Sequence, residues 1–448
     1  MRNYIIKNIS VINEGEITQS DVYIRDQRIA KIAPQIDIPA AAREINGEGK
    51  YLFPGIIDEH VHFREPGLTY KADIYTESRA AVAGGVTSFM EMPNTKPPAL
   101  TWELLEEKYS LASQQSLANY SFYMGVSNDN TEEVLKVNKH KKEICGIKIF
   151  MGSSTGNMLV DNYLTLDHIF SGCELLIATH CENEKMIKEN LQKAIAEKGE
   201  ENLTAADHPV IRNAEVCFTS SLVAVQFAKK YNSRLHILHL TTGKELQLFT
   251  NLIPLKDKKI TAEVCVHHLW FTAGDYAQYG NLIKCNPPIK AGENKEALWQ
   301  GVSDDHIDVI ATDHAPHTWE EKQQPYFKAP GGIPLVQHGL LMMLACYKNG
   351  KISLEKIAEK MCHAPADCYQ IKERGYIREG YFADLAIVDL NDKTNVDKES
   401  ILYKCKWSPF EGHTFPASVE KTFVNGHLAY DKGVFDEYQK GKRLEFER

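Results

Sequence analysis

The sequence lacks the features that mark membrane proteins, disulfide-rich secreted domains and nucleic-acid-binding proteins. Its ten cysteines include no CxxC pair and no close spacing, which favours free thiols over disulfides or thiolate metal sites. No uncharged apolar run reaches membrane-spanning length, and residues 339–347 fit a buried helix better. The first nine residues lack the apolar core of a signal peptide. A net charge of −9 argues against a basic surface for nucleic acid or membrane. We therefore expect a cytoplasmic protein.

The sequence does show the alternation of strand and helix patterns that is typical of a large α/β protein. Its 448 residues exceed the size at which one core stops growing, so more than one domain is expected. Apolar, β-rich segments alternate with helical patterns, and their number predicts a TIM (β/α)8 barrel rather than an open sheet. The eight segments are residues 52–60, 86–92, 120–126, 146–151, 174–180, 235–240, 260–266 and 307–313.

Both ends of the chain have a different character, with short alternating strands and polar turns. These strands are expected at residues 4–11, 17–24, 28–32, 380–390 and 418–430. We predict that the two ends meet as one small β-sandwich. The expected division is 1–51 for the first part of the sandwich, 52–368 for the hydrolase barrel and 369–448 for the second part of the sandwich.

The end of the first barrel segment carries the most informative motif, His60-Val-His62. Side chains alternate along a strand, so the two imidazoles share a face about 7 Å apart and suit one divalent metal. In isolation, such a pair is as well explained by backbone hydrogen bonds. Here it is followed by Arg64 in an Arg-Glu-Pro-Gly turn, and arginine is suited to binding carboxylates. The combination favours a metal site with an anionic substrate.

The barrel hypothesis predicts that reactive residues lie at the C-terminal ends of the strands. Six chemically suitable side chains from five strands meet that demand, which is improbable by chance. They are His60, His62, Lys148, His180, His239 and Asp313.

The later strands contain more histidines than one metal site needs, so some are interpreted as ligands and others as structural. His180 ends the fifth segment and is interpreted as a ligand rather than a simple strand cap. Residues three apart on a strand face opposite ways, so His236 and His239 cannot serve one site. His239 lies nearer the rim and is taken as the ligand, with His236 structural. The pair at 267–268 is ambiguous and is left outside the metal shell.

Lys148 and Asp313 carry the predicted chemistry. An ammonium group only donates hydrogen bonds and cannot bind a cation, so Lys148 is either salt-bridged or chemically altered. A desolvated lysine amine has a lowered pKa and can react with carbon dioxide. The resulting carbamate is an anionic bridge with two oxygens, suited to two metals. Asp313 is predicted to ligate a metal and to accept a proton from activated water.

Two rim loops offer amides to a substrate. Asn94 and Asn286 lie in proline-rich loops, where a hydrogen bond to substrate competes with an ordinary turn-forming role. The hydroxyl-rich segment 152–157 is either a lid or a connector.

Taken together, these motifs resemble the amidohydrolase superfamily and, within its cyclic amidohydrolase branch, the dihydroorotases. The resemblance spans nearly the whole chain, and its blocks stand in the family's order. The blocks are residues 58–67, 92–97, 147–151, 180–182, 239–242, 286–288, 313–317 and 380–390.

The resemblance implies a binuclear centre. His60, His62 and Asp313 would bind one divalent ion, His180 and His239 the other, with Zn²⁺ expected at both sites. Carboxylated Lys148 (N6-carboxylysine) would bridge them. Some relatives place an acid in the loop after strand four instead, but here none precedes Asp161. The implied substrate contacts are Arg64, Asn94 and His317 for a carboxylate, Asn286 for the pyrimidine edge, and Pro330 and Gly331 for further backbone contacts.

The implied reaction is the reversible cyclisation of N-carbamoyl-L-aspartate to (S)-dihydroorotate in pyrimidine (UMP) biosynthesis, with Asp313 as the catalytic acid–base. Allantoinase and dihydropyrimidinase or hydantoinase are the alternatives, because they open similar rings. Their substrates lack a ring carboxylate, so Arg64 favours the dihydroorotases. A metal-free structural homologue is disfavoured because all six ligands are present. We expect a homodimer that acts on a small molecule, with no nucleic-acid or membrane partner.

Overall fold

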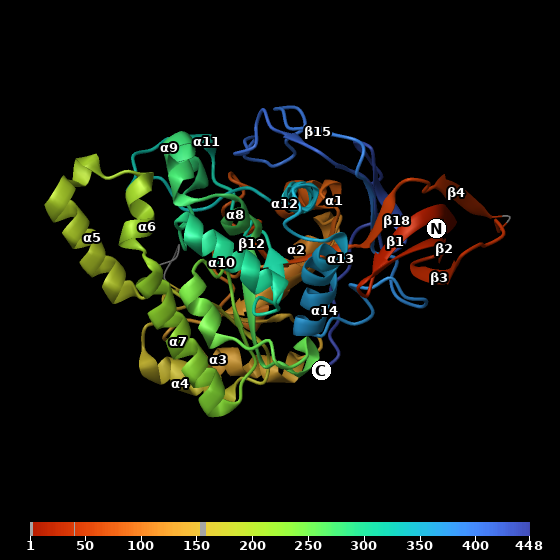
Figure 1. Cartoon of the computed structure of the whole chain (residues 1–448). Coiled ribbons are helices and arrows are strands. Elements are labelled where there is room, and N and C mark those ends of the chain that lie inside the picture. The colour runs from red at the N-terminus through yellow and green to blue at the C-terminus, as the bar shows by residue number, and fades with distance from the viewer. Residues whose placement is uncertain (1–2, 40, 153–157) are drawn as a thin grey trace.

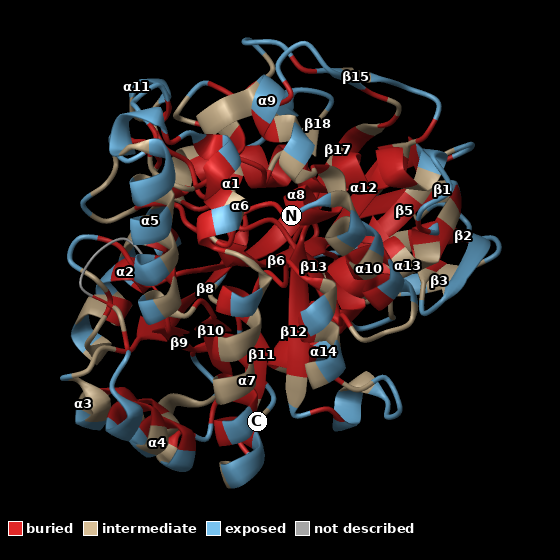
Figure 2. Ribbon diagram, turned by 60° about the vertical axis from the view of Figure 1, so that its left-hand side comes forward, coloured by how far each residue is buried: buried red, intermediate tan, exposed pale blue. Residues whose placement is uncertain are grey.

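The computed structural model describes residues 3–39, 41–152 and 158–448. Within these ranges, eight parallel strands in sequence order form the centre of the larger part of the molecule (Figure 1). Figure 2 shows these strands as a buried interior surrounded by helices with exposed outer faces. The strands are β6 Ile56–Val61, β7 Val86–Glu91, β8 Asn119–Gly125, β9 Gly146–Phe150, β10 Ile177–His180, β11 Leu235–Ile237, β12 Ile260–Cys265 and β13 Val309–Ala311.

The first and last of these strands approach each other and nearly close the barrel. The backbone N–H of His62 donates to the carbonyl of His314 at 2.7 Å. Asp58 in β6 accepts hydrogen bonds from the Thr312 hydroxyl at 2.6 Å and its backbone N–H at 3.2 Å. These bonds link chain segments about 250 residues apart. The predicted α/β fold class, a TIM (β/α)8 barrel with a small β-sandwich domain from both chain ends, is confirmed: a nearly closed barrel of eight parallel strands lies beside a mixed sheet built from strands of both ends.

Helices follow most of the barrel strands, and several of them begin at polar capping residues. Asp73, for example, caps α1 through the backbone N–H of Thr76, which satisfies one of the unpaired donors at a helix start. The helix predicted at 339–347 is α12, which is buried on most of its surface. The helices are α1 Ile74–Ala83, α2 Trp102–Gln115, α3 Thr131–Leu135, α4 Tyr163–Gly172, α5 Glu184–Lys198, α6 His208–Ile211, α7 Ala214–Tyr231, α8 Val266–Trp270, α9 Tyr276–Tyr279, α10 Gly292–Ser303, α11 Trp319–Lys322, α12 Gly339–Lys348, α13 Leu354–Ala358 and α14 Ala364–Tyr369.

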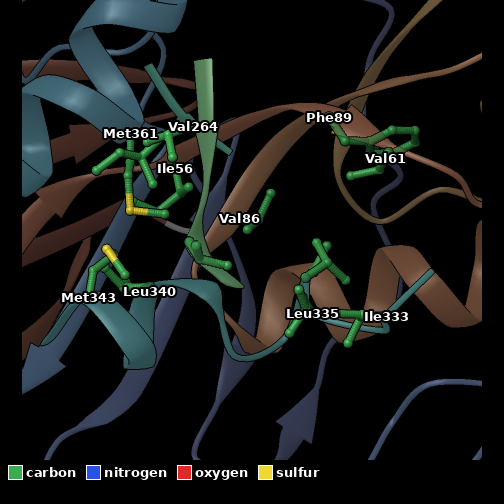
Figure 3. Close-up of a cluster of buried hydrophobic side chains, with 14 of the residues drawn as sticks. Ile56, Val61, Val86, Phe89, Val264, Ile333, Leu335, Leu340, Met343 and Met361 are labelled. Atoms are coloured by element: carbon green, nitrogen blue, oxygen red, sulfur yellow. The ribbon is translucent and has the colours of Figure 1, made fainter. Parts of the chain in front are cut away.

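The main core joins barrel strands to the segment that follows β13. Val61 and Phe89 come from neighbouring strands, and Leu335 and Leu340 come from the chain that enters α12 (Figure 3). Burial of each such side chain contributes about 1.5–3 kcal/mol. This packing holds the 330–340 segment, and with it the loop that borders the C-terminal rim, against the barrel.

Both chain ends contribute to a second, mixed sheet beside the barrel (Figure 1). Its order in the described residues is β19-β18-β17-β14-β5-β1-β2-β3, with β4 also pairing with β1. The N-terminal strands are β1 Asn3–Asn13, β2 Glu16–Arg25, β3 Arg28–Ala33, β4 Ala42–Asn46 and β5 Tyr51–Pro54. The C-terminal strands are β14 Leu385–Asp389, β17 Ser418–Val424, β18 His427–Asp431 and β19 Val434–Phe435, while β15 Thr394–Asn395 and β16 Thr414–Phe415 form a separate pair.

The prediction of a single strand at 52–60 is wrong, because the structure divides this segment at Gly55. Residues before the glycine form β5, which pairs with β1 and β14 in the mixed sheet, and those after it form β6 of the barrel. A Cβ atom at Gly55 would lie 2.1 Å from the Thr87 hydroxyl oxygen. Only glycine permits the close approach at which the chain passes from one sheet to the other. The domain boundaries given above stay a prediction.

The cysteine prediction is confirmed. All ten are free, and nine are buried while Cys405 is partly exposed. Among the described residues, no helix has both the length and the apolar character needed to cross a membrane.

Candidate active site

A pocket lies at the C-terminal ends of the barrel strands. The six predicted ligands all border it, although they lie at the ends of five strands, or just beyond them, that are spread over more than 250 residues. The residues that line it are His60, His62, Arg64, Asn94, Lys148, Phe150, His180, His239, Asn286, Asp313, Ala315, Gly331 and Gly332.

His60, His62 and Asp313 form the first group of possible ligands. The Nε2 atom of each histidine lies 3.2 Å from Oδ1 of Asp313. Nδ1 of His62 lies 2.8 Å from Oδ1 of Asn94. That oxygen only accepts hydrogen bonds, so Nδ1 carries the proton in the neutral ring and Nε2 keeps its lone pair. Nε2 of His60, Nε2 of His62 and a carboxylate oxygen of Asp313 therefore converge, and these are the atom types that bind a divalent metal.

Electrostatics keep Asp313 ionised. Burial alone would raise its pKa, but His60, His62 and His239 hold the pKa of this carboxyl well below its usual range. For His60, burial lowers the pKa, but the charges of Glu263 and Asp313 outweigh it and raise the pKa above its ordinary value. The group is thus compatible with a carboxylate that binds a cation.

His180 and His239 form the second group. Nδ1 of His180 lies 2.9 Å from Nε2 of His239. Nε2 of His180 is turned the other way and lies 3.2 Å from the Glu182 carboxylate. Burial lowers the pKa of both rings, so both are neutral and able to ligate. Nδ1 of His180 and Nε2 of His239 are the atoms that a second metal would meet.

Lys148 lies in β9 at the floor of the pocket. Its Nζ atom is fully buried and has no hydrogen-bond partner among the residues that the structure describes. The same atom lies 4.6 Å from the centre of the Phe150 ring. Burial lowers the pKa of this amine to about 7. The described surroundings therefore provide no salt bridge, and the amine is of the desolvated kind that can react as a nucleophile.

Several site residues have strained backbone conformations. Arg64, His239 and Asp313 adopt φ angles of 68°, 40° and 46°. Such left-handed conformations are costly for residues other than glycine and concentrate at functional sites. Here each strained residue turns a side chain from the end of a strand into the same pocket.

Arg64 borders the pocket with a buried guanidinium group. Its Nε donates to the carbonyl of Pro316 at 3.1 Å, and its Nη2 lies 3.1 Å from Nε2 of His317. No carboxylate lies within ion-pair distance of this cation in the described part of the chain. Burial lowers the pKa of Arg64 to about 10, which reflects the cost of a desolvated positive charge.

His317 cannot accept a hydrogen bond from Arg64. Its Nδ1 lies 2.9 Å from Nζ of Lys71, which only donates, so Nδ1 must accept. Burial and the neighbouring Arg64 charge hold the pKa of His317 well below its usual range. The neutral ring therefore carries its proton on Nε2 and donates to the carbonyl of Gly331 at 3.0 Å. Nη2 of Arg64 faces another donor and remains available to an anion.

The amidohydrolase family model matches residues 51–429. The chain belongs to the amidohydrolase family. It is 31% identical to the allantoinase of Desulfitobacterium hafniense over 98% of each chain. It is also 30% identical to the dihydroorotase of Methanothermobacter thermautotrophicus, over 92% of this chain and 91% of that one. The solved L-hydantoinase (dihydropyrimidinase) of Arthrobacter aurescens superposes with a TM-score of 0.93 at 28% identity, covering 99% and 100% of the two chains. These relatives lie in the cyclic amidohydrolase branch.

The structure of this amidohydrolase separates the predicted substrate contacts into two groups. Arg64, Asn94, Asn286 and Gly331 line the pocket, but His317 and Pro330 do not. His317 lies behind Arg64, and the carbonyl of Pro330 accepts a hydrogen bond from Nζ of Lys322 at 2.9 Å. Asn94 has a structural partner in His62, which its sequence context did not indicate.

Three further histidines of this amidohydrolase lie outside the pocket. His236 lies within the barrel, with Nδ1 2.7 Å from the Thr261 hydroxyl, and does not border the pocket. His267 and His268 are likewise buried outside the lining. Residues 153–157, the main part of the lid or connector, lie outside the described residues.

Glu263 is a site residue that no sequence motif indicated. This acid in β12 contacts Nδ1 of His60 at 2.9 Å and accepts the backbone N–H of His239 at 2.8 Å. A carboxylate that orients the ring of a metal-binding histidine is a common supporting feature of metal sites. The available signal was an acid inside an otherwise apolar barrel strand.

Proposed function

We propose that this amidohydrolase is a dihydroorotase, which interconverts N-carbamoyl-L-aspartate and (S)-dihydroorotate in pyrimidine biosynthesis. The chemistry is hydrolysis, or in reverse formation, of a cyclic amide C–N bond. Family membership supports this reaction class, and the substrate follows from the charge of the pocket.

The observation that carries the substrate proposal is the buried guanidinium of Arg64, which has no ion-pair partner among the residues that the structure describes. An uncompensated buried charge is costly, and a carboxylate can meet a guanidinium with two hydrogen bonds. Both dihydroorotate and N-carbamoyl-L-aspartate retain a carboxylate that does not react. Allantoin, hydantoin and dihydrouracil are rings without one, and they would leave Arg64 unpaired.

The donor set fits two divalent metal ions. His60, His62 and Asp313 would hold one ion, and His180 and His239 the other. Lys148, as a carbamate formed with carbon dioxide, would bridge them, which accounts for a buried amine that has no hydrogen-bond partner in the described part of the chain. When bound, the ions would supply Lewis acidity that activates water and polarises the scissile carbonyl. Zn²⁺ suits this nitrogen- and oxygen-rich set.

Asp313 would move the proton. Its depressed pKa keeps it ionised, so in the hydrolytic direction it accepts a proton from the attacking water. It then donates that proton to the ring nitrogen as the C–N bond breaks. In the cyclisation direction, the same carboxylate removes a proton from the carbamoyl nitrogen as this nitrogen attacks the carbon of the protonated side-chain carboxyl group. It then returns that proton to the hydroxyl group, which leaves as water when the C–O bond breaks. Arg64 would meanwhile hold the unreactive carboxylate and fix the ring in the pocket.

A cyclic amide hydrolase for an uncharged ring is the second candidate. The allantoinase and L-hydantoinase likenesses support it, and they are as extensive as the dihydroorotase likeness. Purified enzyme with measured metal content should be assayed on dihydroorotate, allantoin, hydantoin and dihydrouracil. We expect kcat/KM to be highest for dihydroorotate by a wide margin. A preference for any of the other three would overturn the proposal.

A further inference from the structure

A buried histidine outside the metal set contacts the pocket residue Asn286. His208 in α6 is 4% exposed. Its Nε2 lies 3.1 Å from the backbone carbonyl oxygen of Cys285 and 2.8 Å from Oδ1 of Asn286. Its Nδ1 lies 2.8 Å from the hydroxyl of Tyr326. Both ring nitrogens are therefore engaged, each with different partners.

The partners determine where the ring proton lies. The Cys285 carbonyl only accepts hydrogen bonds, so Nε2 must be the N–H donor. Burial, with Arg212 and Lys284 nearby, holds the pKa of His208 well below its usual range, so the ring is neutral. Nδ1 is then an acceptor. The Tyr326 hydroxyl donates a hydrogen bond to that nitrogen. Burial raises the pKa of Tyr326 to about 12 and so keeps this phenol protonated.

The same logic extends to the amide of Asn286. An N–H at Nε2 of His208 requires an acceptor opposite it, which is Oδ1 of the amide. A rotated amide would place its own NH₂ group against that N–H, so two donors would face each other at 2.8 Å. The NH₂ group is consequently the end of the amide that is left for the pocket, which Asn286 lines.

We propose that His208 is a positioning residue that orients the Asn286 amide so that its NH₂ group binds a carbonyl oxygen of the cyclic substrate. The inference rests on the proposed function for the identity of that carbonyl. With the carboxylate at Arg64 and the scissile carbonyl at the ligand cluster, the remaining acceptor of dihydroorotate is the urea carbonyl between the ring nitrogens. Gly331 leaves room for this arrangement, because a Cβ atom there would lie 3.2 Å from Cγ of Asn286.

Glutamine and glutamate have nearly the same shape, so substituting each for His208 separates the orientation of the Asn286 amide from the packing of the side chain at position 208. In His208→Gln, the side-chain amide can still donate toward Asn286. In His208→Glu, a carboxylate, kept ionised by the positive charges of Arg212 and Lys284, can only accept and should reverse the Asn286 amide. We expect KM for dihydroorotate to stay within about threefold of wild type in the glutamine variant. In the glutamate variant it should rise at least about tenfold, with kcat changed less.

A double-mutant comparison tests whether the effect passes through Asn286. In an Asn286→Ala background, replacing His208 by glutamate should raise KM no further. Asn286→Asp provides a test that does not depend on folding of the His208 variants. It keeps an acceptor for His208 but presents an oxygen to the pocket, and KM should again rise at least about tenfold. Metal content and melting temperature are measured for every variant.

Equal KM values for the glutamine and glutamate variants would overturn the inference. So would an undiminished effect of the glutamate in the Asn286→Ala background, or wild-type KM in Asn286→Asp. The proposed function fails separately, if wild-type enzyme does not turn over dihydroorotate. The same variants would then be tested on the ring that the enzyme does open, because every cyclic amide offers a carbonyl oxygen.

Discussion

Oε1 of Glu263 lies 2.9 Å from Nδ1 of His60, deep beneath the pocket. This contact turns Nε2 of the imidazole toward Asp313, 3.2 Å away. The same oxygen of Glu263 accepts the backbone N–H of His239 at 2.8 Å. One buried acid thus supports a residue from each of the two groups of possible ligands.

Glu263→Gln should weaken metal binding without removing a ligand. The amide oxygen can accept both bonds, but it carries no full negative charge, and the NH₂ group would replace Oε2, which lies 3.2 Å from Nδ1 of His60. Loss of such a support costs about 10–100-fold in metal affinity or activity. Metal content after dialysis against a chelator, measured with kcat/KM, provides the test. Glu77→Gln is the matched control. Oε2 of Glu77 lies 2.8 Å from Nε2 of His314, and neither residue lines the pocket. Equal metal retention in the two variants would contradict the role of Glu263.

Arg64→Lys should be far more harmful than conservation of charge suggests. Lysine cannot reproduce the planar pair of hydrogen bonds that arginine offers a carboxylate. The charge-assisted contact is worth about 1.5–3 kcal/mol, so dihydroorotate affinity should fall about tenfold or more. Steady-state kinetics measure the change. Near-normal values on dihydroorotate would show that Arg64 does not bind the carboxylate and would favour the uncharged-ring candidates.

Asp313→Asn should yield a folded, largely metallated protein with little turnover. The amide oxygen can still coordinate a metal, but the amide does not accept the proton of the attacking water. We expect at least a 10²-fold loss in kcat, roughly the scale of a positioned acid–base group. Circular dichroism and metal analysis accompany the kinetics. Retention of metal with more than half the activity would assign proton transfer to another group.

Lys148→Ala should abolish activity and reduce metal content, because it removes the proposed bridging anion. Four imidazoles and one carboxylate would then have to hold two dications that repel each other. Acetate or propionate in the assay should partly restore turnover by filling the vacated position. A crystal structure of active wild-type enzyme with two metals and an unmodified Lys148 amine would contradict the carbamate.

Reconstitution of the wild type should depend on carbon dioxide and on pH. Since burial lowers the pKa of Lys148 to about 7, the neutral amine that attacks carbon dioxide becomes the major form above that pH. Recovery of activity from metal-free protein should therefore accelerate as pH rises through about 7 at constant dissolved carbon dioxide. It should slow in buffers purged of the gas. A rate indifferent to carbon dioxide would argue for an unmodified lysine.

Stability of the whole chain should depend on Arg374, which forms a buried ion pair with Asp384. Asp384 also accepts from Asn119 of β8 at 3.2 Å and from the backbone of Asn425 at 2.7 Å, so it joins the barrel to the mixed sheet. Arg374→Met leaves this carboxylate buried without its cation, and should cost about 3–5 kcal/mol in urea unfolding. The exposed pair of Lys351 and Glu296 is the control, with less than about 1 kcal/mol expected for Lys351→Met.

Much of the pocket was predictable because local patterns and one topological rule determine it. Parallel barrel strands place their C-terminal ends on one rim, so strand-end residues such as His180 and Asp313 could be assigned to a common site from sequence alone. The alternation of side chains along a strand likewise put His60 beside His62. These residues could be assigned from their positions on the strands, without knowing which side chains they contact.

Only the tertiary structure determined which residues far apart in the chain contact each other. His60 and Glu263 are 203 residues apart, and His208 and Asn286 are 78 apart. No local periodicity encodes such contacts, because they depend on how whole strands and loops pack. The division of one expected strand at Gly55 depended on Thr87 of the next strand. The sequence by itself determined the fold class and which chemical groups gather at the rim. The tertiary structure determined which nitrogen of each histidine faces the pocket and which buried cation has no ion-pair partner within the described residues, because hydrogen-bond direction and desolvation exist only once distant segments meet.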